Sequence, residues 1–140
     1  MTETEKHTYL RTHEIRGDAL SLDLDHESTS ILEAAKETDS GRAAKTLVKE
    51  GPLRLTIMGF AAGSALHEHK AAGPVSIEVR SGLVEVRVGA TSSSLAAGDI
   101  LILDEEISHS LVAASDAVLL LTIAISEKPK RAYCRQILAH

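Results

Sequence analysis

The chain has 140 residues, of which 44% are hydrophobic and 25% are charged, and its net charge is −5. This balance is typical of one globular domain with a sizeable core, and because the sequence also lacks a basic stripe it argues against binding to nucleic acids or anionic membranes. The single cysteine, Cys134, excludes an internal disulfide and a thiolate-rich zinc site.

The N-terminal residues are polar and show only weak strand patterns. Met1 to Lys6 lacks an apolar core, so we expect no secretory signal and a cytoplasmic location. Thr8 to Arg16 alternates weakly and is predicted as a short strand. Ala19 to Leu24 alternates clearly between apolar and polar residues, which predicts a half-buried strand.

A helix is predicted after this strand. Ser30 and Glu33 have the spacing of a capping box, and apolar residues on one helical face follow the serine. The pattern predicts a short helix from about 30 to 38. Residues 1–41 are therefore expected to form an N-terminal extension with a strand and a short helix.

From residue 42 onward the pattern changes to short strands separated by glycine-containing turns, which favours a β-sandwich or barrel. Val75 to Val79 and Val84 to Val88 each alternate, and Ser81-Gly82 between them predicts a hairpin. Ala117 to Ile125 is nearly all apolar, as expected for a strand covered on both faces. Other strands are predicted at 42–49, 53–57, 100–103 (buried) and 109–113, with a loop or edge piece at 89–94.

This pattern divides the chain into three segments. The extension is followed by a barrel at 42–126 and a C-terminal tail at 127–140.

Two histidine clusters carry the candidate chemistry. His67 and His69 are two residues apart, so in a regular strand they point to the same face and can share one ion. Leu66 and Glu68 then point the other way. His109 follows after a hairpin and another strand, so a neighbouring strand can supply it as a third ligand. By itself the His-x-His pattern is more typical of two solvated histidines at a strand end than of a metal site.

The glycines around these histidines resemble the two motifs of the cupin superfamily. The first motif is Gly, five residues, His-x-His, three or four residues, Glu, six residues, Gly; His67, His69 and Gly82 match it. The second is Gly, five residues, Pro-x-Gly, two residues, His, three residues, Asn; Gly98 and His109 match it.

The resemblance covers roughly residues 42 to 125 and is to small single-domain cupins of the cupin 2 conserved barrel type. It implies an all-β, cupin-like double-stranded β-helix (a jelly-roll barrel) with the histidines inside, here with a short N-terminal helix. Small cupins commonly pair through their sheets, so the resemblance also implies a homodimer. The strand expected at Ala19 to Leu24 could add to the partner's barrel.

The chain departs from both motifs. The glutamate ligand of the first motif falls at Gly73, Pro74 or Val75, and none of these side chains binds a metal. Glu106 stands where the second motif has its glycine. Glu105 and Glu106 are expected to lie in a solvated loop.

The resemblance therefore implies a site with three metal ligands, His67, His69 and His109. The expected cofactor is a divalent transition metal (Fe, Zn, Ni, Mn or Cu), because imidazole ligands do not choose among them. Three neutral imidazoles leave the charge of the ion undiminished, which favours a small anionic ligand or a bound hydroxide. Open coordination positions permit dioxygenase- or isomerase-type chemistry on a small anionic molecule.

Two alternatives remain open. A non-catalytic cupin could bind a small ligand or a metal as a sensor or storage module, which the missing glutamate favours. A barrel that has lost its metal would retain the histidines as remnants in a polar pocket. In each case the partner is a small molecule, with no nucleic acid and no membrane.

Overall fold

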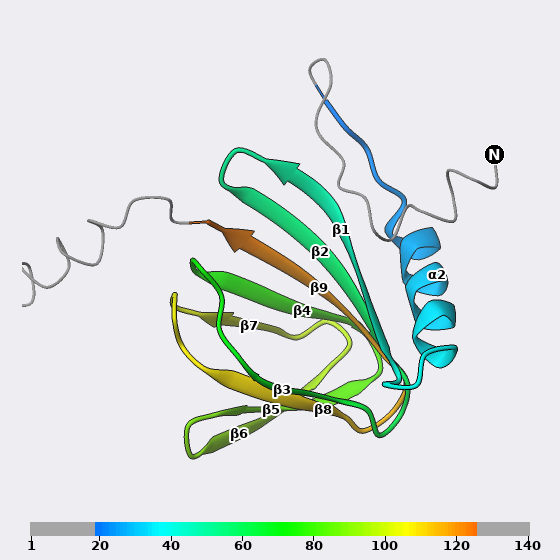
Figure 1. Cartoon of the computed structure of the whole chain (residues 1–140), viewed down its shortest axis with the longest axis vertical. Helices are drawn as coiled ribbons and strands as arrows, with labels where there is room; N and C mark the ends of the chain where they lie inside the picture. Colours follow the sequence, from blue (N-terminus) through cyan, green and yellow to red (C-terminus); the bar gives the residue numbers. More distant parts are fainter. Residues whose placement is uncertain (1–18, 126–140) are drawn as a thin grey trace, which may run out of the picture.

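The computed structural model describes residues 19–125, which form two facing β-sheets and one helix (Figure 1). The strand predicted at 8–16 and the tail at 127–140 lie outside these described residues. The all-β architecture with a short N-terminal helix is confirmed. The division of the chain at residues 41 and 126 stays a prediction.

Sheet A has five antiparallel strands and sheet B has four. The order in sheet A is β1 (Arg42–Glu50), β2 (Leu53–Phe60), β9 (Ala117–Ala124), β4 (Val75–Ser81) and β7 (Ile100–Leu103). The order in sheet B is β3 (Ala65–His69), β8 (His109–Ala113), β5 (Leu83–Val88) and β6 (Thr91–Ala96). After β2 the chain passes repeatedly from one sheet to the other, as in a jelly roll.

The space between the sheets is filled by aliphatic side chains and one ring, that of Phe60. Alternate residues of each strand supply them, since successive side chains of a strand point to opposite faces. We call this set the inner cluster; its buried members are Phe60, Val75, Ile77, Val79, Val84, Val86, Leu95, Leu103, Leu111, Ala113, Ala117, Leu119 and Leu121.

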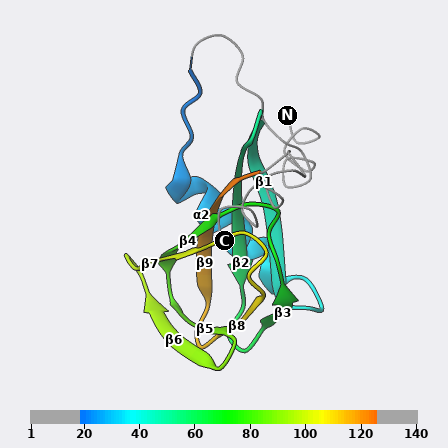
Figure 2. The same cartoon turned by 90° about the vertical axis from the view of Figure 1, so that its left-hand side faces the viewer.

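Helix α2 (Leu24–Lys36) covers the face of sheet A that is turned away from sheet B (Figure 2). It buries Ile31 and Ala35, which are four residues apart and so lie on one helical face. Ile31 packs in an outer cluster with Leu47, Val48, Ile57, Val118 and Leu120. The partly buried ion pair between Lys45 Nζ and Glu27 Oε1, at 2.8 Å, also joins the helix to β1.

The strand predicted at Ala19 to Leu24 is wrong, and the helix begins earlier than its predicted range of 30 to 38. Asp23 is the N-cap, and its side chain accepts a hydrogen bond from the His26 backbone N–H at 3.1 Å. Acidic residues in the first turn complement the positive end of the helix dipole. The capping signal at Ser30 therefore lies inside a helix that has already started.

The predicted hairpin between β4 and β5 is also wrong. β4 pairs with β9 and β7 in sheet A, whereas β5 pairs with β6 and β8 in sheet B. Gly82 between them has φ +85°, and a Cβ there would lie 2.1 Å from the carbonyl oxygen of Asp116. The chain thus changes sheets at a point too tight for any side chain, and the alternation of the two strands cannot distinguish this crossing from a hairpin.

Two predictions concern strands that prove to be sheet edges. β7 was expected to be buried, but Ile100 and Ile102 are 55% and 69% exposed because this strand is the edge of sheet A. The edge piece expected at 89–94 corresponds to β6, the edge of sheet B.

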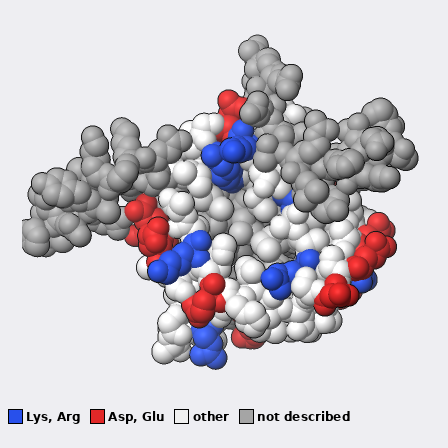
Figure 3. Space-filling model, in the orientation of Figure 1, with Lys and Arg blue, Asp and Glu red and all other residues white. Residues whose placement is uncertain are grey.

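No helix among residues 19–125 is long and apolar enough to cross a membrane. Basic and acidic side chains lie interspersed on the face drawn in Figure 3.

Candidate functional site

A β-bulge in β3 determines where the histidines of the first cluster lie. Leu66 pairs with Leu111 and His69 pairs with His109, so three steps along β3 match two steps along β8. One extra residue in a strand breaks the strict alternation of its side chains. His69 therefore stands opposite the inward-facing His109. In a regular strand, Glu68 would have been the residue opposite His109.

His109 is the buried member of the site. Only 2% of its surface is exposed, and its neighbours on the same face of β8, Leu111 and Ala113, belong to the inner cluster. Its Nδ1 lies 3.2 Å from the carbonyl oxygen of Ile107. A carbonyl can only accept, so this bond requires the proton on Nδ1 and leaves the lone pair on Nε2.

His69 and His109 form a close pair. Their ring centroids are 5.5 Å apart and their planes meet at 89°, an edge-to-face arrangement. Partial burial, and to a lesser extent the charge of His109, hold the pKa of the His69 imidazole below its ordinary value of 6.5. Both causes favour the neutral ring, which is the form that binds metals.

His67 lies in the bulge and is exposed. Among residues 19–125, no group of three or more His, Cys, Asp or Glu side chains is close enough to hold a metal ion. The structure thus brings together two of the three predicted ligands, His69 and His109. The three-histidine site stays a prediction.

The loop before His109 differs from the solvated loop that was expected. Glu105 is buried, with 9% of its surface exposed, whereas Glu106 is exposed. The Glu106 backbone N–H donates to the Ala71 carbonyl at 3.1 Å, which ties this loop to the β3–β4 connection. Glu106 has φ +65°, a conformation that glycine adopts without strain, and it occupies the glycine position of the second motif.

The histidine pair fits half of a metal site. With metal–nitrogen distances of about 2.0–2.1 Å, two imidazoles on one ion have ring centroids roughly 5 Å apart. The observed 5.5 Å is close to that separation. The bond from His109 Nδ1 to a backbone carbonyl is the outer contact that commonly fixes a histidine ligand. The remaining positions would be filled by His67, water or a ligand.

Solved structures with a similar fold include several cupins. One is a cupin superfamily protein from Desulfitobacterium hafniense, with 15% identity over 61% of this chain and 78% of that chain, and a TM-score of 0.59. Another is a cupin 2 conserved barrel domain protein from Leptotrichia buccalis, with 26% identity over 66% of this chain and 45% of that chain, and a TM-score of 0.58.

A variant of salicylate 1,2-dioxygenase from Pseudoaminobacter salicylatoxidans is also similar, with 20% identity over 83% of this chain and 35% of that chain, and a TM-score of 0.62. No protein-family model and no curated protein sequence matches the chain. The predicted resemblance to cupins and the cupin barrel fold are confirmed by these structures.

Proposed function

We propose that this cupin barrel binds one divalent transition metal through His69 and His109 and presents it to a small anionic molecule. The observation that carries the proposal is the bond from His109 Nδ1 to the Ile107 carbonyl. It leaves Nε2 as the free lone pair of a ring that stands 5.5 Å from a second imidazole. The lowered pKa of His69 supports it, because less proton competition opposes metal binding near neutral pH.

His67 is proposed as the third ligand, reached by rotation of its exposed side chain when the ion binds. Its position in the bulge, between Leu66 and His69, keeps it on the same strand end as the pair. Since no third side chain among the described residues is already in place, His67 should contribute less to affinity than the other two. A smaller loss of metal affinity for His67 than for His69 and His109 would indicate a preformed pair, whereas equal losses would indicate a preformed three-ligand site.

The chemistry proposed is of the dioxygenase or isomerase type. A bound ion with open positions supplies Lewis-acid or oxygen chemistry. The protein's own contribution is to hold His109 in one tautomer from its buried strand and to place His69 across from it. The fold shared with a salicylate 1,2-dioxygenase is in keeping with a small anionic substrate.

Metal titration of chelator-stripped protein tests the metal site. Isothermal titration with Zn²⁺ should give about one equivalent for the wild type, and His69→Ala and His109→Ala should each weaken binding by more than the roughly 10–100-fold that losing an outer partner of a ligand costs. His67→Ala should weaken it less, and His26→Ala, on the exposed surface of α2, should leave it unchanged. Wild-type affinity in both His69→Ala and His109→Ala would exclude the pair as the metal site.

A non-catalytic binding module is the second candidate. The observation that favours it is that two histidines converge and the glutamate of the first motif is missing. Oxygen consumption and product analysis with small carboxylate and thiol substrates, on protein loaded with Fe²⁺, Mn²⁺, Ni²⁺ or Zn²⁺, decides between them. Turnover that is lost in His109→Ala supports an enzyme, whereas tight metal binding without turnover supports the module.

A homodimer and a cytoplasmic location stay predictions. The strand at 19–24 that was expected to pair with a partner is not formed, so the dimer needs another surface. The edge strand β7, with Ile100 and Ile102 exposed, is the surface we propose, since unpaired apolar edges favour association. Light scattering should give the mass of two chains, and Ile102→Lys should give one; a wild-type monomer would refute the dimer.

A further inference from the structure

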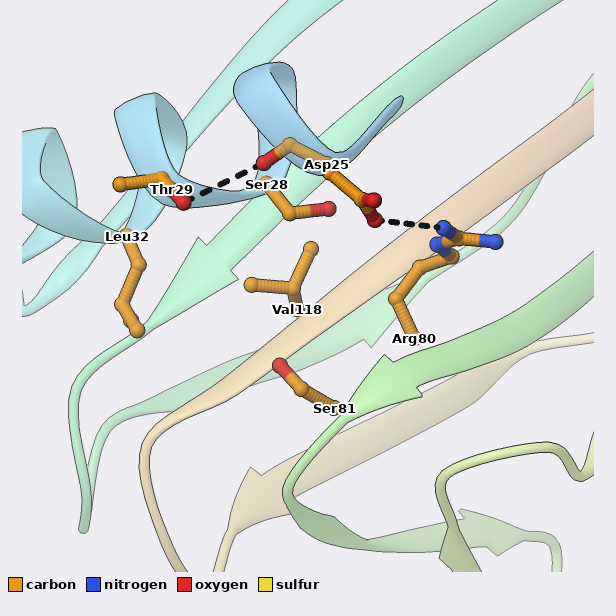
Figure 4. A pocket seen from close by; sticks show the side chains of 7 residues that line it. All are labelled: Asp25, Ser28, Thr29, Leu32, Arg80, Ser81 and Val118. Atoms are coloured by element: carbon orange, nitrogen blue, oxygen red, sulfur yellow. Dashed lines mark hydrogen bonds and ion pairs between the residues drawn. The ribbon is translucent and has the colours of Figure 1, made fainter. Parts of the chain in front are cut away.

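A cavity of about 360 Å³ lies on the outer side of sheet A, away from the histidines and between α2 and the strands β4 and β9 (Figure 4). Its volume is in the range of small-molecule sites. Polar groups come from Asp25, Ser28, Arg80 and Ser81, and an apolar wall comes from Leu32 and Val118.

A second β-bulge turns the polar residues of β4 toward this cavity. Val79 pairs with Leu119 and Ser81 pairs with Val118, so β4 has one residue more than β9 between these pairs. The extra residue is Arg80. Because Val118 packs in the outer cluster, its partner Ser81 also lies on the outer side of the sheet. The bulge thus places two consecutive polar side chains at the cavity, where a regular strand would place one.

Two enclosed polar atoms at the cavity lack hydrogen-bond partners. Within residues 19–125, neither Ser28 Oγ nor Arg80 Nε has one, although both atoms are closed to solvent. Buried donors without a partner are costly, and native structures rarely keep them. Figure 4 shows Ser28 reaching the cavity from α2 and Arg80 reaching it from β4, with Val118 below Ser28.

The Arg80 guanidinium is only loosely held by its own neighbours. Its Nη2 lies 3.6 Å from Asp25 Oδ1 and its Nη1 lies 3.7 Å from Glu78 Oε2. Charge-assisted hydrogen bonds of this kind are about 2.7–2.9 Å long, so neither contact is a full one. The Asp25 side chain is 97% exposed, so solvent screens its attraction for the guanidinium.

We propose that this cavity binds a small monocarboxylate with a short apolar body. Its carboxylate would accept from Arg80 Nε and Nη2 as a fork and from the Ser28 hydroxyl, and its alkyl part would contact Leu32 and Val118. Asp25 competes for the same guanidinium, and the local charge of Asp25, Glu78 and Arg80 together is negative. The affinity is therefore expected to be modest, in the millimolar range, and limited by Asp25.

NMR titration of chelator-stripped, metal-free protein with butyrate tests the site; the readout is the Arg80 Nε–Hε signal in the proteins that keep Arg80 and the backbone amide signal of the cavity residue Val118 in Arg80→Gln. The signal should shift saturably, and butyramide, which is uncharged, should shift it at least tenfold less at equal concentration. Asp25→Asn should tighten butyrate binding several-fold, since it removes the competing carboxylate without touching the packed core. Ser28→Ala should weaken binding several-fold.

Arg80→Gln should abolish butyrate binding. Arg54→Gln is the control and should leave binding unchanged, because the Arg54 guanidinium donates to the Gly51 carbonyl elsewhere on the sheet. Binding to the metal site would instead be lost in His109→Ala and retained in Arg80→Gln. The proposal is overturned if butyrate causes no saturable shift at Arg80, or if Asp25→Asn and Arg80→Gln both bind it with wild-type affinity.

Discussion

Sheet A and sheet B of this barrel are built differently on their outer faces. Helix α2 covers the outer face of sheet A over β1, β2 and β9, so the central strand β9 is buried through five consecutive residues, whereas Ile100 and Ile102 of the edge strand β7 are exposed. On β5 and β8 of sheet B, inward residues such as Val86 and Leu111 are buried, whereas the outward-facing Val112 is 47% exposed. The central strands of sheet A are thus packed on both faces, whereas sheet B is packed on its inner face and exposed to solvent on its outer face.

This difference in packing between the two sheets places the residues that stabilise the fold and the histidine pair in different parts of the barrel. Sheet A contributes to both hydrophobic clusters, so changes within it act on the whole fold. Sheet B has exposed polar residues at its β3 end, outside the inner cluster, and this is where His69 stands opposite His109. We therefore expect substitutions in sheet A to change stability first and those at the β3–β8 end to change metal binding first.

The largest effect is expected at Gly82, where the chain passes from sheet A to sheet B. Gly82→Ala should destabilise the protein by about 4 kcal/mol or more, because the new Cβ would meet backbone atoms of Asp116 and Ala117. Urea unfolding measures this change. Gly89→Ala is the matched control: its φ is also positive, at +61°, but nothing lies within 4 Å, so about 1–2 kcal/mol is expected. Equal losses would mean that the close crossing is not what Gly82 provides.

The outer faces of the two sheets can be compared with one truncation on each. Ile57→Ala, in the outer cluster of sheet A, should cost about 2–5 kcal/mol, as large-to-small changes in packed cores do. Val112→Ala, on the outer face of sheet B, should stay within about 0.5 kcal/mol. Unfolding midpoints at a constant m-value give both numbers. A large loss for Val112→Ala would show that sheet B is covered in solution.

A stabilising change is expected in the loop that leads to His109. Glu106→Gly should raise the free energy of unfolding by about 0.5–1 kcal/mol, since glycine relieves the strain of φ +65°. Glu106→Ala removes the same carboxylate but keeps the strain, so it should bring no gain. If the alanine variant gains as much, the charge and not the backbone conformation is responsible.

The smallest effect concerns pH. Because the folded pKa of His69 lies below its ordinary value of 6.5, the unfolded chain takes up this proton first as the pH falls. His69 thus lowers stability progressively as the pH drops below about 6.5, and His69→Gln should lose less stability between pH 7 and pH 5.5. NMR titration should show the His69 pKa rising part of the way toward its ordinary value in His109→Gln, with the effect of burial remaining. An ordinary pKa in the wild type would contradict the pairing.

Sequence patterns predicted most strands after residue 42, but they failed at Ala19 to Leu24, which alternates without forming a strand, and they did not show where a strand contains an added residue. Bulges in β3 and β4 re-aim His69 and Arg80, and neither leaves a mark in the alternation of hydrophobic residues. A third bulge in β1 turns the consecutive residues Leu47 and Val48 both into the outer cluster. The direction of these side chains depends on how each strand pairs with strands that are distant in the sequence. The local sequence does not contain that information.

The candidate site was predictable to the same limited extent. The spacing of the cupin motifs predicted His67, His69 and His109 as a group, and the structure brings two of them, His69 and His109, close together. It also placed a glycine position at Glu106, which the positive φ bears out. The burial of Glu105 and the cavity at Arg80 had no sequence signal, since both depend on how separate elements pack.

Long-range nitrogen NMR of the histidine rings tests the central claim most directly. In metal-free protein His109 should be the Nδ1-protonated tautomer, because Nδ1 donates to the Ile107 carbonyl. On adding one equivalent of Zn²⁺, His109 Nε2 and one nitrogen of His69 should change together at the same stoichiometry. An Nε2-protonated His109 in the metal-free protein, or zinc-induced shifts that leave both rings unchanged, would contradict the account.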